Sequence, residues 1–225
     1  MIELRHLSKT YVVNGIRKVV ARDLTFTFPA GQSVALLGRN GAGKSSLLRM
    51  IAGVMDPDSG QVIRHGSVSW PVGFAGSFHG DLTGAQNAKF IGRIYGVETD
   101  AMVDFVRDFC GLGEHYHLPV RTYSSGMRAR LAFACSMAIR FDTYLIDEVT
   151  AVGDGAFRAK SEVILLDRLR TSGAIVVAHG MEILRKLCTA GVVLENGRLF
   201  YYPRIERAIE HHEHVLRGQL PPWMR

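Results

Sequence analysis

The residues with the clearest chemical meaning form one short stretch, Gly38–Ser45. It reads Gly-Arg-Asn-Gly-Ala-Gly-Lys-Ser, which is a glycine, four further residues and then Gly-Lys-Ser. An apolar run, Ser33–Leu37, precedes it, and a helical pattern, Ser46–Ala52, follows it. A buried strand, a glycine-rich turn and a helix start in this order are typical of a loop that binds phosphate groups.

Each residue type in this loop has a physical task. Glycine adopts φ > 0 readily, so the backbone can wrap round a phosphate with its N–H groups pointing inward. The helix that follows adds about half a positive charge at its N-terminus. Lys44 can reach the β- and γ-phosphates of a nucleotide, and the Ser45 hydroxyl can ligate Mg²⁺. The residues expected to bind a nucleoside triphosphate here are Gly38, Arg39, Asn40, Gly41, Ala42, Gly43, Lys44, Ser45 and Ser46.

Two adjacent carboxylates end a second apolar run. Thr143–Ile146 has the composition of a buried strand, and Asp147 and Glu148 follow it directly. Such a pair suits two roles: Asp147 holds Mg²⁺, directly or through water, and Glu148 orients and deprotonates the attacking water. The alternative is a charged strand-to-loop junction without chemistry, but the phosphate loop favours a catalytic pair.

Three further places carry candidate residues. Tyr11 ends a strand-like segment, and its ring could stack on a base or pack on the sheet edge; the residues alone leave both open. The segment Ser124–Met127 precedes a helix, and small side chains at a helix start admit anions. The apolar strand Ala174–Ala178 delivers His179 to the sheet edge where ligands bind, either as a γ-phosphate contact or as a hydrogen-bonded rim histidine.

Composition narrows the class of protein. A chain of 225 residues fits one domain with a subdomain, and its net charge is +6. The basic residues are scattered and no aromatic–basic RNA motif appears, so we expect no direct nucleic-acid binding. The sequence contains no uncharged apolar run of about 18 residues, the length needed to span a bilayer. Its strand-like start leaves no room for a signal peptide. The cysteines, Cys110, Cys135 and Cys188, lack CxxC spacing and are expected to be reduced core residues.

The elements that position these residues alternate between strands and helices, except in one region. Two β-rich stretches, Ile2–Tyr11 and Lys18–Phe28, predict an antiparallel edge in front of the phosphate loop. Two consecutive helical patterns, Ala85–Tyr95 and a second that ends at Gly111, have no strand between them. We therefore predict an α/β fold: a P-loop NTPase core (1–77 and 141–204) with an antiparallel β edge subdomain, an inserted α-helical subdomain (78–140), and a C-terminal helix and tail (205–225).

The C-terminal part holds a hairpin, a helix and a tail. Val192–Phe200 is predicted to be a hairpin with an Asn-Gly turn. The helix that follows, Ile205–Leu216, carries His211, His212 and His214. These three do not share one helix face, so a solvated surface is expected rather than a metal site. Pro221-Pro222-Trp223 is expected to form a flexible tail.

With these motifs in this order, the chain resembles the nucleotide-binding subunit of ABC transporters from end to end. The matching motifs are an aromatic at the adenine position (Tyr11), Walker A (Gly38–Ser45), a signature motif (Ser124, Ser125, Gly126, Met127), Walker B (Leu145–Glu148), a D-loop (Ala151–Asp154) and a switch histidine (His179). The resemblance implies ATP and Mg²⁺ as cofactors, Glu148 and His179 as catalytic residues, and Ser45 and Asp147 as metal ligands. It also implies Asp154 as the D-loop residue and a homodimer in which each signature motif closes on the ATP of the other subunit, so that Ser125 and Gly126 act in trans.

Two departures indicate a subfamily. The signature is Tyr-Ser-Ser-Gly-Met, and Walker B continues as Asp-Glu-Val-Thr-Ala-Val-Gly-Asp. Both are similar to the subfamily that exports lipid-linked polysaccharides. The short chain and the Ser-Val-Ser-Trp-Pro segment, Ser67–Pro71, most resemble capsular polysaccharide export ATPases. We therefore expect an ATPase on the cytoplasmic face of the inner membrane, bound to a separately encoded permease that handles the polysaccharide. The alternatives are export of O-antigen or teichoic acid, a soluble ABC ATPase acting on nucleic acid or ribosomes, and a P-loop kinase.

One family feature is missing from the sequence. Other members place a glutamine in the loop that joins the core and the helical insert, but no glutamine lies between Gln61 and Gln86. The backbone or His79 could replace it, or the coupling could be rebuilt. Thr83 and Gln86 have capping-box spacing, so Gln86 is expected to cap a helix instead.

Overall fold

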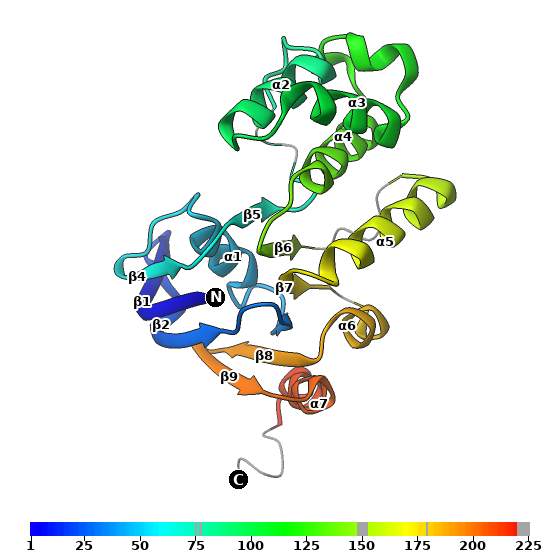
Figure 1. Ribbon diagram of the computed structural model, residues 1–225. Helices are drawn as coiled ribbons and strands as arrows, with labels where there is room; N and C mark the ends of the chain where they lie inside the picture. The colour runs from blue at the N-terminus through cyan, green and yellow to red at the C-terminus, as the bar shows by residue number, and fades with distance from the viewer. Residues whose placement is uncertain (75, 77, 148–152, 179, 220–225) are drawn as a thin grey trace. The chain divides into compact units, whose positions relative to one another are not determined.

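The computed structural model describes residues 1–74, 76, 78–147, 153–178 and 180–219. The chain forms two compact units (Figure 1). Unit 1 comprises Met1–Pro71, Phe141–Glu148 and Thr171–Arg225, and unit 2 comprises Val72–Arg140 and Val149–Arg170. The predicted subdomain boundaries stay a prediction, and the division into these units groups the helix after Walker B with the helices of the insert.

Unit 1 is built on a six-stranded sheet with the order β5-β6-β7-β3-β8-β9. The strands are β3 (Ser33–Leu37), β5 (Val68–Pro71), β6 (Thr143–Asp147), β7 (Gly173–Val177), β8 (Ala190–Glu195) and β9 (Arg198–Tyr202). All neighbours pair in parallel except β9, which pairs antiparallel with β8. Between those two strands, Asn196 and Gly197 have φ of 49° and 74°, which confirms the predicted Asn-Gly turn. The parallel arrangement brings the carboxyl ends of β3, β6 and β7 to one edge.

A second, three-stranded sheet in unit 1 confirms the predicted antiparallel edge. It consists of β1 (Ile2–Val13), β2 (Ile16–Phe28) and β4 (Ser59–Arg64) in the order β2-β1-β4, with both pairs antiparallel. The helix α1 (Lys44–Ala52) contributes Leu47, Leu48, Met50 and Ile51 to one apolar core shared with both sheets. Figure 1 shows α1 beside the strands of both sheets. The start of α1 is therefore fixed by apolar packing on two sides.

The C-terminal helix α7 (Ile205–Leu216) packs against β8, β3 and β9, and α6 (Met181–Leu187) lies beside it. The expected solvated surface for its histidines is wrong for two of them, because His211 is 0% exposed and His212 is 7% exposed. A helix laid along a sheet buries a stripe wide enough to include adjacent residues. The Tyr202 hydroxyl lies 2.9 Å from His211 Nδ1, and Glu195 Oε2 lies 3.4 Å from His211 Nε2. Burial lowers the pKa of His211 even though the Glu195 carboxylate opposes that shift.

Unit 2 is helical. It contains α2 (Gly84–Ile94), α3 (Thr99–Cys110), α4 (Ser125–Ala138), α5 (Gly155–Leu169) and two short 3₁₀ helices, Gly113–His117 and Val120–Thr122. Phe109 of α3 packs against Phe133 of α4 and Phe157 of α5, with ring centroids 5.9 and 5.6 Å apart. Gly111 ends α3 in the left-handed conformation, as its position after the apolar pattern predicts. An aromatic core therefore joins α3, the middle of α4 and the start of α5.

Two expectations from composition can be compared with the structure. The three cysteines are free and buried, and burial raises the pKa of the Cys188 thiol to about 12. None of the described helices combines the length and apolar character needed to span a bilayer.

Candidate nucleotide-binding site

The phosphate loop leaves β3 and enters α1 through a backbone that requires glycine. Gly38 has φ of 150° and Gly43 has φ of 109°. A Cβ on Gly43 would lie 2.6 Å from Cβ of Val20, and a Cβ on Gly38 would lie 2.5 Å from the carbonyl oxygen of Leu194. The sequence pattern and the tertiary packing therefore demand the same residue at both positions.

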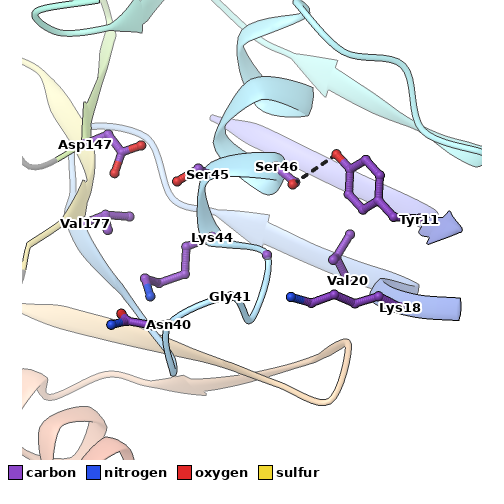
Figure 2. Close-up of a pocket in the computed structure, with 11 residues that line it drawn as sticks. Tyr11, Lys18, Val20, Asn40, Gly41, Lys44, Ser45, Ser46, Asp147 and Val177 are labelled. Atoms are coloured by element: carbon purple, nitrogen blue, oxygen red, sulfur yellow. Dashed lines mark hydrogen bonds between the residues drawn. The ribbon is translucent and has the colours of Figure 1, made fainter. Parts of the chain in front are cut away.

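Lys44 lies across this loop. Its Nζ donates to the carbonyl oxygen of Gly38 at 2.7 Å and to that of Arg39 at 3.2 Å. Figure 2 shows the ammonium group on the same side of the loop as Asn40. Two backbone acceptors thus hold the positive charge where an anion bound by the loop would meet it.

The loop borders a cavity of about 500 Å³ in unit 1, which is within the size range of small-molecule sites. Its lining comes from the three-stranded sheet, the phosphate loop and the carboxyl ends of β6 and β7. The lining residues are Tyr11, Lys18, Val20, Asn40, Gly41, Gly43, Lys44, Ser45, Ser46, Asp147 and Val177. The fold thus gathers Tyr11, most of the phosphate loop and Asp147 round one hollow, as Figure 2 shows. Lys18, Val20 and Val177 were not predicted, because β2 and β7 carry no motif that marks them.

Tyr11 is held at the edge of this cavity by contacts to α1 and to the segment after it. Its hydroxyl donates to Ser46 Oγ at 3.1 Å and lies 3.1 Å from Met55 Sδ. Beside it, Asp58 accepts from the backbone N–H of Thr10 at 2.6 Å and from Lys9 Nζ at 2.8 Å. Tyr11 therefore packs at the edge and also lines the cavity, so stacking on a base stays a prediction that the geometry permits.

Two oxygen donors lie at the opposite end of the cavity. Ser45 and Asp147 both line it, and Figure 2 shows the Ser45 hydroxyl and the Asp147 carboxylate on the same side of it. Mg²⁺ in nucleotide sites is held by one or two side-chain oxygens together with phosphates and water, so this donor set fits the ion. Among the described residues, no three His, Cys, Asp or Glu side chains gather as an independent metal site.

Several predicted residues lie outside the described part of the chain. These are Glu148, the first part of the D-loop (Ala151 and Val152), the switch histidine, His179, and the expected tail, Pro221-Pro222-Trp223. Their roles stay predictions from sequence.

Asp154, the last D-loop residue, lies within the description and begins α5. Its Oδ1 accepts from the N–H of Phe157 at 2.9 Å, and its Oδ2 pairs with the Arg130 guanidinium of α4 at 2.7 Å. The Phe157 N–H and, after it, the Arg130 guanidinium hold the pKa of Asp154 below its ordinary value. This carboxylate therefore stays ionised and links the D-loop to the signature helix.

The signature motif forms the exposed start of α4 in unit 2. Ser124 Oγ accepts from the N–H of Met127 at 3.2 Å, and Ser125 and Gly126 are exposed. A hollow of about 590 Å³ is lined here by Ser124, Gly126, Met127, Arg130 and Asp154, together with His115, Gly111, Leu112 and Gly153. The structure thus brings the signature and the D-loop aspartate to one surface. Arg130 and His115 were not predicted, since neither belongs to a recognisable motif.

The segment that lacks the family glutamine is held by a different amide. Buried Asn87 accepts from the N–H of His79 at 2.9 Å, and its Nδ2 donates to the carbonyls of His79, Leu82 and Thr83 at 3.0–3.3 Å. The capping box is confirmed: Thr83 Oγ1 accepts from the N–H of Gln86, and Gln86 Oε1 accepts from the N–H of Thr83. Gln86 therefore caps α2. Whether His79 or the backbone replaces the missing glutamine, or the coupling is rebuilt, stays open as predicted from the sequence.

Comparison with known proteins places the chain in a family. The model of the ABC transporter family matches residues 21–151. The polysialic acid transport ATP-binding protein KpsT of Escherichia coli is 43% identical over 216 residues, which cover 95% of this chain and 96% of that protein. The capsule polysaccharide export ATP-binding protein CtrD of Neisseria meningitidis serogroup B is 42% identical over 212 residues, covering 94% and 98%.

A solved structure supports the fold. The dimeric, post-hydrolysis state of the ATP-binding cassette MJ0796, bound to ADP and phosphate, matches with a TM-score of 0.75 at 18% identity and covers 91% of this chain and 99% of that one. The chain therefore belongs to the ABC transporter family, as one of its ATP-binding ATPase subunits. The predicted ABC-type α/β fold is confirmed.

Proposed function

We propose that this chain is the ATP-hydrolysing subunit of an exporter that moves lipid-linked capsular polysaccharide across the inner membrane. The observation that carries the ATPase part is the single cavity that joins the phosphate loop, Lys44, Ser45 and Asp147. The cargo rests on the similarity, at 42–43% identity along nearly the whole chain, to proteins named for polysialic acid transport and capsule polysaccharide export.

Different residues of the cavity bind different parts of Mg-ATP. The loop N–H groups and Lys44 hold the phosphates, Tyr11 stacks on the adenine, and Ser45 and Asp147 hold Mg²⁺. When bound, Mg²⁺ neutralises charge on the phosphates. Glu148 follows Asp147 directly and takes the proton of the attacking water, while His179 contacts the γ-phosphate.

The exposed signature motif, Ser124–Met127, supports a second copy of the chain in the proposed assembly. Ser125 and Gly126 are exposed at a helix start, where N–H groups and the helix dipole favour an anion. In the proposed homodimer, Ser124, Ser125, Gly126 and Met127 of each subunit close on the ATP of the other. A separately encoded permease handles the polysaccharide and holds the dimer at the cytoplasmic face of the inner membrane.

The test is where the polysaccharide accumulates in cells that lack this chain. Cells are complemented with the wild type or with Glu148→Gln, and polymer is measured inside the cell and at its surface. We expect polymer to build up inside and only the wild type to restore it to the surface. Surface capsule that is unchanged without the protein would exclude capsule as cargo, and loss of O-antigen or teichoic acid instead would reassign it.

A further inference from the structure

The cavity holds a cation that lies outside every motif. Lys18 comes from β2 and is the direct cross-strand partner of Tyr11 on β1. Directly opposed residues of an antiparallel pair project to the same face of the sheet. Both side chains accordingly line the cavity, and Figure 2 shows them on the side of the phosphate loop opposite Asp147.

The Lys18 ammonium lies against the phosphate loop itself. A Cβ built on Gly41 would lie 2.9 Å from Lys18 Nζ, so the charge sits at contact distance from the middle of the loop. Lys44 Nζ engages the same loop through the carbonyls of Gly38 and Arg39. Two ammonium groups therefore flank one loop, one supplied by α1 and the other by the three-stranded sheet.

The surroundings of Lys18 are positive. Within the described ranges, its ammonium forms no ion pair with a carboxylate. A neighbouring hollow of about 690 Å³ is lined by Arg17, Lys18, Arg22 and Arg39 together with one carboxylate, Glu195, which faces His211. Four cations against one carboxylate give the hollow a net positive charge, and a net positive surface next to N–H groups attracts a polyanion.

We propose that Lys18 is a second phosphate-binding cation of this site, which contacts the polyphosphate of ATP and ties the three-stranded sheet to the bound nucleotide. The proposal rests on the ATPase function proposed above. Lys18 is a binding residue: it adds affinity for the phosphates, and proton transfer is left to Glu148.

The experiment measures binding of ATP and of tripolyphosphate, which lacks base and ribose, to the purified full-length chain by titration calorimetry. We expect Lys18→Ala to raise both dissociation constants about tenfold, the effect of losing one charge-assisted hydrogen bond. The matched control is Arg17→Ala, which removes the same charge from the adjacent residue of β2 that does not line the nucleotide cavity. It should change either constant less than about threefold, and Lys18→Arg should restore most of the affinity.

Three outcomes would overturn the proposal. Equal weakening by Arg17→Ala and Lys18→Ala would show only a general effect of surface charge. Weaker ATP binding with unchanged tripolyphosphate binding would place Lys18 on the base or ribose. No change with Lys18→Ala would show that the ammonium does not reach the ligand. Failure of the underlying function is distinguishable, since the wild type and Lys44→Ala would then bind ATP equally poorly.

Discussion

Two helices of this chain begin at motifs that are expected to bind ATP: α1 at Walker A and α4 at the signature motif. The first turns of these helices are capped differently. α1 starts after Gly43 in the left-handed conformation, and no side chain caps it. α4 starts after Ser124, whose hydroxyl caps the helix by accepting from Met127. The Walker A helix α1 therefore has no side-chain cap on its first N–H groups, whereas the signature helix α4 caps one of its own.

The glycines of the two motifs show the same difference. Substituents on Gly38 and Gly43 would collide with Leu194 and Val20, but the nearest atom to a Cβ on Gly126 is Ser124 Oγ at 3.9 Å. The fold of one chain explains the Walker A glycines. It does not explain Gly126, so we propose that the small size of this residue serves the approach of the partner subunit's ATP.

The largest expected effect is on ATP hydrolysis, and the substitution that causes it should leave ATP affinity unchanged. Glu148→Gln removes the general base, so ATP hydrolysis should fall about a hundredfold or more, while ATP affinity stays at the wild-type value. The trapped ATP should also hold two chains together, which gel filtration with and without Mg-ATP would detect. Hydrolysis at the wild-type rate would rule out Glu148 as the base.

A substitution at the signature tests whether its partner is a phosphate on another subunit. Gly126→Asp places a carboxylate in the first turn of α4, where the helix dipole favours it, so the folded chain should melt at or slightly above the wild-type temperature. Hydrolysis should nevertheless fall at least about tenfold, because the new charge repels ATP and displaces the closing surface. Gly126→Ala is the matched control without charge. Full activity of Gly126→Asp would remove the signature from the site.

The glycine comparison predicts opposite effects on stability. Gly43→Ala should lower the free energy of unfolding by about 1–3 kcal/mol, because it combines φ > 0 with a collision against Val20. Gly126→Ala should change it by less than about 1 kcal/mol and in the stabilising direction, since alanine favours a helix. Urea unfolding without nucleotide measures both. Equal losses would show that the two helix starts are not built differently.

The smallest expected effect is on ATP affinity, and it comes from substitutions of Tyr11, which lines the nucleotide cavity. Tyr11→Phe keeps the ring and loses the hydrogen bond to Ser46, so ATP affinity should change less than about threefold. Tyr11→Ala should weaken ATP about tenfold, the usual worth of one stacked base. Titration of ATP beside tripolyphosphate sharpens the result, because only ATP should respond to loss of the ring.

Much of the phosphate loop and several local features of the fold could be predicted because they are encoded in consecutive residues. The order strand, glycine-rich loop, helix at Gly38–Ser45, the capping box at Thr83 and Gln86, and the turn at Asn196-Gly197 are all short-range patterns, and the structure contains each of them. The expectation for the α7 histidines was wrong, because helical spacing gives the side-chain directions but not which side a sheet will cover.

By itself, the sequence determined the phosphate loop and the strand that presents Asp147, since backbone freedom and a short apolar run act over a few residues. The segment Ser124–Met127 was expected to precede a helix, but that helix, α4, already begins at Ser125. Only the tertiary structure decided which residues distant in sequence come into contact. Lys18 of β2 lies against Gly41, the Tyr11 hydroxyl donates to Ser46, and Arg130 pairs with Asp154. These contacts depend on strand register and on how apolar faces pack, and neither leaves a local pattern in the residues that finally touch.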